Sequence, residues 1–255
     1  MTDRVLAAFP GCSLAWSDEF DGVAGSPVDP GTWQNEVGGH GWGNDELQYY
    51  TDGTENASLD GDGSLAIVVR RPDPRFIDRH CGGRTYTSAR LTSKDRMSFS
   101  YGLVQARIRL PAGRGMWPGF WMLGHDIDAA GWPQCGEIDV MESFGRDPAV
   151  VHGTVHGPGY SGRAGVTAEH DAGSSLAAGF HVYSIAWEPG KISWYLDDER
   201  YSTVTPGDLR GSPWVFDHNF FLLLNVAVGG TFSETPDSSV LFPQVMLVDY
   251  VRFYT

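Results

Sequence analysis

The stretch Gly136-Glu137-Ile138-Asp139-Val140-Met141-Glu142-Ser143 places three carboxylates within six residues, separated by apolar side chains. Like charges this close repel, so at least one carboxyl is expected to hold its proton above its normal pKa. Paired carboxyls with separated pKa values are the groups that acid/base and nucleophilic catalysis use. The pattern indicates a catalytic carboxylate set. An acidic strand edge and a metal site are the alternatives.

The spacing of the carboxylates favours a strand with one irregularity. On a helix the three side chains would point in three directions, whereas on a strand Glu137 and Asp139 share one face. Strict alternation would then bury Glu142, and an unpaired charge in a core is costly. One extra residue, a β-bulge at Val140-Met141, returns Glu142 to the side of Glu137. The two Glu carboxyls can then approach to about 5–5.5 Å, the separation that retaining glycosidases use.

Aromatic and polar motifs accompany this stretch along the chain. They are Trp16-Ser17-Asp18-Glu19-Phe20, Asn44-Asp45-Glu46-Leu47-Gln48-Tyr49-Tyr50-Thr51, Gly115-Met116-Trp117-Pro118-Gly119-Phe120-Trp121-Met122-Leu123, Trp132-Pro133, Leu224-Asn225-Val226-Ala227-Val228-Gly229-Gly230 and Val248-Asp249-Tyr250-Val251-Arg252-Phe253-Tyr254. Together with the central Glu-x-Asp-x-x-Glu they closely resemble glycoside hydrolase family sixteen. Within that family the nearest branch is the bacterial laminarinases, which are endo-β-1,3-glucanases. The resemblance runs from about Trp16 to Tyr254.

Composition limits the classes of partner. The net charge of −14 makes nucleic acid an unlikely ligand, because few basic groups are present to neutralise phosphates. No apolar run is long enough to span a membrane. The chain of 255 residues is ordinary for one β-sandwich, and it shows no repeat, linker or low-complexity tail. We expect residues 1–255 to form a single catalytic domain, with 1–15 as a lead-in segment, and to act as a monomer.

Short alternating runs and frequent turn residues predict an all-β fold. The 33 Gly and 15 Pro mark many turns, and Asp60-Gly61-Asp62-Gly63 is a hairpin signal. We expect strands over 86–94 and over 103–110, with Gln105 facing outward, and a central strand over 220–228. The resemblance implies a β-jelly roll, a concanavalin-like sandwich of two curved antiparallel sheets with the substrate cleft on its concave face.

The resemblance also assigns the catalytic residues. Glu137 matches the nucleophile of the family and Glu142 the general acid, which then acts as base. Asp139 lies between them on the same face, where we expect it to hydrogen-bond Glu137 and hold the charge state of the set. A proton shared in this way gives apparent pKa values that belong to the group.

Six further residues match sugar-binding positions of laminarinases. Trp117, Trp121 and Trp132 match tryptophans that stack on sugar rings, Asn44 and Arg90 match hydrogen-bond donors to sugar hydroxyls, and His156 matches a histidine near the acid/base. Each has a plainer interpretation as well. The tryptophans fit a core, His156 fits a hydrogen-bonded position on a strand face, Arg90 an exposed arginine, and Asn44 a turn. Trp132 lies in a Gly/Pro loop, which favours a role as a platform on which a sugar ring stacks.

The resemblance implies no cofactor for catalysis but a structural calcium ion far from the chemistry. The matching positions are Glu19 and Gly63, through their backbone carbonyls, and Asp249, through its carboxylate. Oxygen-only ligands suit calcium. A chain without this metal is the alternative.

Three cysteines, Cys12, Cys81 and Cys135, have no zinc-site spacing, and their pairing cannot be deduced. Cys135 is expected to be a small packed thiol, since a Cys nucleophile with a His base has no supporting pattern. The chain carries no signal peptide. Because a polymeric glucan is too large to enter a cell, we expect an extracellular, secreted protein whose signal has been removed.

The principal functional hypothesis is therefore endo-hydrolysis of β-1,3-glucosidic bonds in laminarin-type β-glucans, by a retaining double displacement. A mixed-linkage β-1,3-1,4-glucanase and an agarase-like galactanase are the enzymatic alternatives. The same fold also serves glucan-binding, lectin-like proteins that lack one or both catalytic carboxylates. Both glutamates are present here, which favours the enzyme.

Overall fold

The computed structural model describes residues 9, 11–73 and 83–255. Its strands are β1 (Leu14–Asp18), β2 (Gln34–Asn35), β3 (Gln48–Tyr50), β4 (Ala57–Leu59), β5 (Leu65–Val69), β6 (Tyr86–Ser88), β7 (Arg90–Thr92), β8 (Gly102–Arg109), β9 (Met116–Gly124), β10 (Glu137–Glu142), β11 (Val150–His156), β12 (Val166–Asp171), β13 (His181–Glu188), β14 (Lys191–Leu196), β15 (Glu199–Val204), β16 (Phe220–Val228) and β17 (Gln244–Tyr254). The helical pieces are α3 (Ile127–Ala130) and the 3₁₀ turns η1 (Gly162–Ala164) and η2 (Pro206–Leu209).

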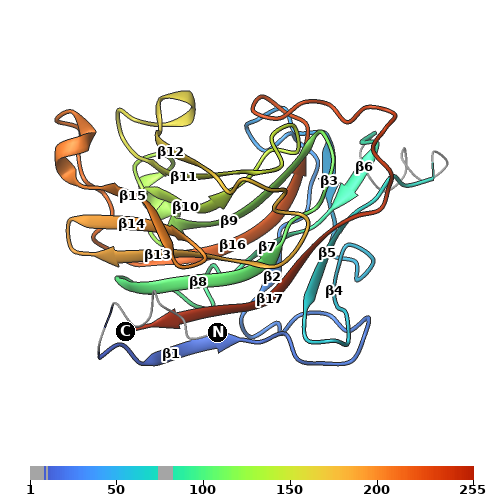
Figure 1. Cartoon of the computed structure of the whole chain (residues 1–255), viewed down its shortest axis with the longest axis horizontal. Coiled ribbons are helices and arrows are strands. Elements are labelled where there is room, and N and C mark those ends of the chain that lie inside the picture. Colours follow the sequence, from blue (N-terminus) through green and yellow to red (C-terminus); the bar gives the residue numbers. More distant parts are fainter. Residues whose placement is uncertain (1–8, 10, 74–82) are drawn as a thin grey trace.

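Two large antiparallel sheets make up the fold (Figure 1). The seven-stranded sheet, here the cleft sheet, has the order β12-β11-β10-β9-β16-β7-β2. The eight-stranded sheet, here the back sheet, has the order β15-β14-β13-β8-β17-β5-β4, and β1 lies beside β17. A two-stranded parallel pair, β3 and β6, completes the strands. The predicted all-β sandwich is confirmed.

The space between the sheets is filled by large apolar side chains. Every residue of β16 is buried, as its nearly continuous apolar run predicts for a central strand. Trp187 and Trp194 of the back sheet are each 1% exposed and belong to the same core cluster as Phe120 of β9. These tryptophans are core residues, so the tryptophan richness of the chain serves packing as well as the cleft.

Two local predictions differ from the structure. The expected strand over 86–94 is divided at Ala89: β6 pairs with β3, whereas β7 pairs with β16 in the cleft sheet. Gln105 was expected on the outward face of β8, yet it is fully buried. Its amide N–H group lies 3.5 Å from the hydroxyls of Tyr250 and Tyr254. A polar residue in an alternating strand is thus covered by aromatic side chains of the neighbouring strand.

Within the described ranges, no helix has the length and apolarity needed to cross a membrane. Cys135 is fully buried, as expected for a packed thiol, and neither it nor Cys12 takes part in a described disulfide. Cys81 lies outside the described residues. Burial raises the pKa of the Cys135 thiol to about 11, which makes it a poor nucleophile at neutral pH.

Candidate active site

A β-bulge in β10 carries the three carboxylates of the central motif. On β9, the partners of Asp139 and Met141 are adjacent residues, so Val140 is the extra residue of β10. The register with β11 shifts over the same segment, between Asp139 and Glu142. The predicted bulge at Val140-Met141 is confirmed.

The bulge sorts the side chains of β10 between core and solvent. Ile138, Val140 and Met141 are buried in the core between the sheets. Glu137, Asp139 and Glu142 all line a cleft of about 610 Å³ on the other face of the cleft sheet. The three carboxylates therefore converge although their spacing does not follow strict alternation.

Each glutamate accepts a hydrogen bond from a tryptophan. The Trp132 indole Nε1–H donates to Oε2 of Glu137 at 2.6 Å, and the Trp117 Nε1–H donates to Oε1 of Glu142 at 2.8 Å. Trp132 stands at the cleft with 47% of its surface exposed, whereas Trp117 is 9% exposed. Trp117 also packs against Phe144, with ring centroids 5.6 Å apart. The Trp132 ring is therefore accessible from the cleft, whereas most of the Trp117 ring is covered and its N–H is held by Glu142.

Asp139 and His156 join the set on the β11 side. His156 Nε2 lies 3.2 Å from Oδ2 of Asp139 and 3.9 Å from Oε1 of Glu137. A side-chain hydrogen bond links Asp139 with Glu137, so one of these two carboxyls carries a proton. Asp139 is 2% exposed.

Burial is the largest cause of the raised pKa values of these carboxyls. The pKa of Glu137 is raised to about 8 and that of Glu142 to about 7, while the pKa of Asp139 lies well above its usual range. Mutual repulsion adds to the effect, because the charge of Asp139 raises the pKa of Glu137 and that of Glu137 raises the pKa of Glu142. The tryptophan N–H groups act in the opposite direction. The set therefore retains at least one proton at neutral pH and titrates as a group.

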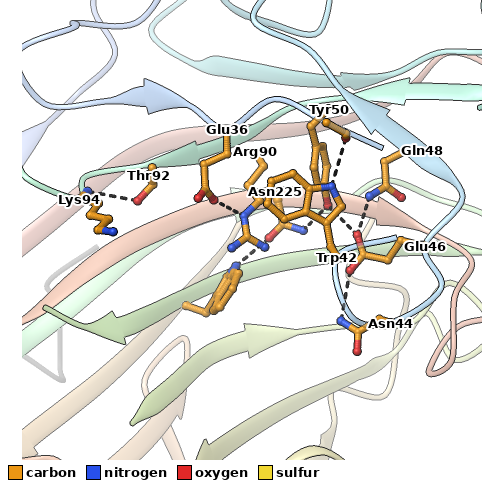
Figure 2. A network of polar contacts seen from close by, with 12 residues as sticks. Glu36, Trp42, Asn44, Glu46, Gln48, Tyr50, Arg90, Thr92, Lys94 and Asn225 are labelled. Atoms are coloured by element: carbon orange, nitrogen blue, oxygen red, sulfur yellow. Dashed lines mark hydrogen bonds and ion pairs between the residues drawn. The ribbon is translucent and has the colours of Figure 1, made fainter. Parts of the chain in front are cut away.

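One half of the cleft, toward β7, is organised around Arg90. Its guanidinium carbon lies 4.6 Å from the ring centroids of both Trp42 and Trp121, and its Nε–H donates to Glu36 (Figure 2). An arginine held between two rings is fixed in orientation. This contact contradicts the interpretation of Arg90 as an exposed arginine, because its side chain is only 12% exposed.

A buried network behind Arg90 was not predicted from the sequence. Glu46 accepts hydrogen bonds from Gln48, Tyr50 and Asn44, and Asn225 donates to the Tyr50 hydroxyl at 3.0 Å (Figure 2). Burial is the main cause of the raised pKa of Glu46. Two signals in the sequence point to this network. Glu46, Gln48 and Tyr50 alternate along one face, and Asn225 interrupts an otherwise apolar run.

The other half of the cleft, toward β12, is crossed by an arginine. Arg163 of η1 donates from Nη2 to the Thr231 carbonyl at 3.0 Å, and its guanidinium lies 5.2 Å from the Phe232 ring. η1 follows the C-terminal end of β11, and Thr231 follows the C-terminal end of β16. Because β11, β10, β9 and β16 are successively antiparallel, β11 runs opposite to β16, and these two C-terminal ends lie at opposite ends of the strands in the cleft sheet. Arg163 and Phe232 both line the cleft. A long ligand in this half must pass the arginine or displace it.

The structure gathers nine of the predicted site residues in this one cleft. They are Asn44, Arg90, Trp117, Trp121, Trp132, Glu137, Asp139, Glu142 and His156. Trp121 donates to the Asn225 side chain at 2.7 Å, and Asn44 donates to Glu46 at 3.2 Å. The three predicted calcium positions do not line the cleft: Glu19 follows the end of β1, Gly63 lies in the turn before β5, and Asp249 is in β17.

Glu137, Asp139 and His156 could also hold a metal ion, since one ligand atom from each lies within 4.8 Å of the others. These groups also have polar partners of their own: His156 Nε2 lies 3.2 Å from Oδ2 of Asp139, and the Trp132 N–H donates to Glu137. A shared proton accounts for the arrangement without an ion.

Comparison with known proteins gives consistent matches. Residues 42–229 match the model of glycosyl hydrolases family 16. A β-glucanase of Rhodothermus marinus is 42% identical over 259 aligned residues, covering 96% of this chain and 86% of that protein. The endo-β-1,3-glucanase of Pyrococcus furiosus is 44% identical, covering 96% of this chain and 94% of that one, with a TM-score of 0.88. The laminarinase catalytic domain of Thermotoga maritima is 43% identical, with a TM-score of 0.87 and coverage of 96% and 98%.

Proposed function

The chain belongs to glycosyl hydrolase family 16, and on that premise we propose that it is an endo-acting β-1,3-glucanase that cleaves laminarin-type glucans with retention. The observation that carries the proposal is the pairing of Glu137 and Glu142 across the β10 bulge, each with a tryptophan N–H on its carboxyl. Relatives named as laminarinase and endo-β-1,3-glucanase support the choice of linkage.

The first step of the reaction requires opposite charge states in the two glutamates. Glu142 delivers its proton to the glycosidic oxygen, while the Glu137 carboxylate attacks the anomeric carbon and forms a glycosyl-enzyme. In the second step Glu142 removes a proton from water, which attacks the anomeric carbon and releases Glu137. The raised pKa of Glu142 suits a group that must be protonated near neutral pH.

Asp139 shares a proton with Glu137 and thereby controls when Glu137 is ionised. Asp139 is the most buried of the three, and both its charge and its hydrogen bond with Glu137 raise the pKa of Glu137, so in the free enzyme the Glu137 carboxyl donates to Asp139. The Trp132 N–H and the nearby His156 act in the opposite direction and favour the charged form of Glu137. Glu137 can attack only after its proton has passed to Asp139, so Asp139 is the proton acceptor that frees the nucleophile.

The shape of the cleft suits internal attack on a polymer. Lining residues extend on both sides of the carboxyls, from Trp42 and Asn44 at the β7 half to Thr167 and Glu169 on β12. Trp132 offers an exposed indole beside the nucleophile, on which the apolar face of a pyranose can stack. Arg90 and Asn44 place hydrogen-bond donors for sugar hydroxyls in the β7 half of the cleft.

A structural calcium ion remains part of the proposal. β17 pairs with β5 at Val248 and with β1 at Val251, so Asp249 lies between the strand ends that carry Gly63 and Glu19. This convergence fits a site built from two carbonyls and one carboxylate. The competing contact is Arg107, whose Nη1 lies 2.6 Å from Oδ2 of Asp249. An ion would have to share that carboxylate with the arginine.

Secretion and a monomeric state are also proposed. A polymeric substrate must be met outside the cell, and the net charge of −14 suits a protein that stays dispersed near neutral polysaccharide. Size-exclusion chromatography with light scattering tests the second point.

A reducing-sugar assay on laminarin, lichenan and agarose tests the function. We expect fastest release from laminarin, with product sizes typical of internal cleavage, and none from a Glu137→Gln, Glu142→Gln double variant. Preference for lichenan would indicate a mixed-linkage enzyme, and preference for agarose a galactanase. Binding of laminarin without hydrolysis of any polymer would instead indicate a lectin-like protein.

A further inference from the structure

A tryptophan of the back sheet reaches through the core to the catalytic bulge. Trp194 of β14 is 1% exposed, and its indole Nε1–H donates to the backbone carbonyl of Asp139 at 2.8 Å. Asp139 is the last residue of β10 before the register shift. The bond is buried, and the indole N–H is the only group of Trp194 that takes part in it.

The strand next to the bulge is shaped to admit this indole. Gly153 of β11 lies between the residues that pair with Asp139 and Glu142, so it faces the extra residue. A Cβ added to Gly153 would come within 2.4 Å of Cδ1 and 2.7 Å of Nε1 of Trp194. Only glycine at this position lets the edge of the indole approach the bulge.

The direction of this bond distinguishes it from a ladder bond. Carbonyls in a regular antiparallel pair point along the sheet toward the neighbouring strand. The Asp139 carbonyl accepts from a side chain of the opposite sheet, so this bond comes from the core side of the sheet. A bulge favours such a bond, because it interrupts the ladder locally and leaves backbone groups without a partner on the neighbouring strand.

We propose that Trp194 is a positioning residue for catalysis, which holds the β10 bulge through the Asp139 carbonyl and thereby sets the placement of Glu142 relative to Glu137. The inference rests on the proposed glucanase function. Without the N–H, a buried carbonyl loses its partner and the peptide is free to relax toward the ladder. A shift of that kind would move Glu142 away from the cleft face, since alternation sends neighbouring side chains to opposite faces.

The test compares two tryptophans that make the same kind of bond in the same core. Trp194→Phe removes the donor to Asp139. Trp187→Phe is the matched control, because Trp187 is also 1% exposed and donates through Nε1 to the Phe216 carbonyl at 3.0 Å, away from the bulge. For both variants and the wild type, kcat and KM on laminarin, the pH profile of kcat/KM and the melting temperature are measured.

A positioning role predicts a split between the variants. Trp194→Phe should lower kcat at least about tenfold, with KM within about threefold, because small misplacements of reacting groups are costly in rate. It should also shift the alkaline limb of the pH profile, because the pKa of Glu142 depends on its distance from Glu137. Trp187→Phe should lower the melting temperature similarly but leave both kcat and the pH profile near the wild type.

Equal kcat values and superimposable pH profiles for the two variants would overturn the proposal. If Trp194→Phe does not fold, the benzothiophene analogue of tryptophan at position 194 replaces the N–H by sulfur and keeps the ring shape, and the same outcomes apply to it. Failure of the wild type and Trp187→Phe to hydrolyse any glucan would refute the proposed function instead, which separates the two conclusions.

Discussion

Glu137 is expected to destabilise the folded protein at neutral and alkaline pH, and Glu137→Gln should remove that penalty. Burial and the charge of Asp139 raise the pKa of Glu137 from 4.5 to about 8. A carboxyl whose pKa is raised by folding contributes stability that is complete below its unfolded pKa and is lost as the pH rises through its folded pKa. The penalty should therefore develop between about pH 4.5 and pH 8.

The size of the effect follows from the shift. At about 1.4 kcal/mol for each pKa unit, a shift from 4.5 to about 8 sets an upper limit of roughly 5 kcal/mol. The side chain is 17% exposed and shares its proton with Asp139, so we expect about 1–3 kcal/mol. In a chain of 255 residues this raises the melting temperature by about 3–10 °C. The glutamine amide can donate to Asp139 while its oxygen accepts from Trp132, so the hydrogen bonds survive.

Melting curves between pH 4 and pH 9 test this reasoning. Glu137→Gln should melt above the wild type at pH 8, and the two curves should converge near pH 4. Glu199→Gln, which changes an exposed carboxylate of β15, is the control and should not show this pH-dependent gap. A folded Glu137→Gln that melts at or below the wild-type temperature at pH 8 would refute the argument that burial in the folded protein disfavours the ionised form of this carboxyl.

Four further outcomes are expected. Glu137→Ala should abolish hydrolysis while keeping glucan binding, and azide should restore turnover; residual activity within about tenfold of the wild type would reject Glu137 as the nucleophile. NMR of an early laminarin digest should show the β-anomer first, and initial release of the α-anomer would mean inversion and a wider carboxyl separation of about 6.5–9.5 Å. Trp117→Phe removes an N–H that lowers the pKa of Glu142, so the alkaline limb of kcat/KM should move to higher pH; an unmoved limb would argue against Glu142 as the acid. Calcium at about 100 times its Kd should stabilise the fold by about 2.7 kcal/mol, Asp249→Ala should erase that response, and a melting curve indifferent to calcium and chelator would argue against the site.

Much of the catalytic arrangement follows from short-range pattern. Asp139 and Glu142 are three residues apart, so a regular strand would send them to opposite faces and bury one of them. Because burying a charge is costly, a bulge follows from local chemistry alone. The alternation of β8 and the apolar run of β16 likewise predict which faces enter the core. These features depend on a period of two residues and on burial, and both can be deduced without knowing the neighbours.

Features that depend on distant neighbours could not be deduced in this way. The 86–94 run has strand character throughout, and only its two different partners divide it at Ala89. Gln105 has an outward phase, but Tyr250 and Tyr254 cover it. The sequence is equally compatible with a solvent-exposed Arg90, and only the fold shows that two indoles from other segments enclose it.

The sequence by itself therefore determined the all-β class, the bulge and the cleft-side position of the carboxylates, because these follow from alternation and the cost of buried charge. Only the tertiary structure decided how the bulge is supported and how strongly its carboxyls are perturbed. Trp194 meets Asp139 across 55 positions of sequence, and the raised pKa values arise from burial by the assembled sheets. Such contacts require the chain to be folded, since neither desolvation nor a partner from the opposite sheet exists along an isolated strand.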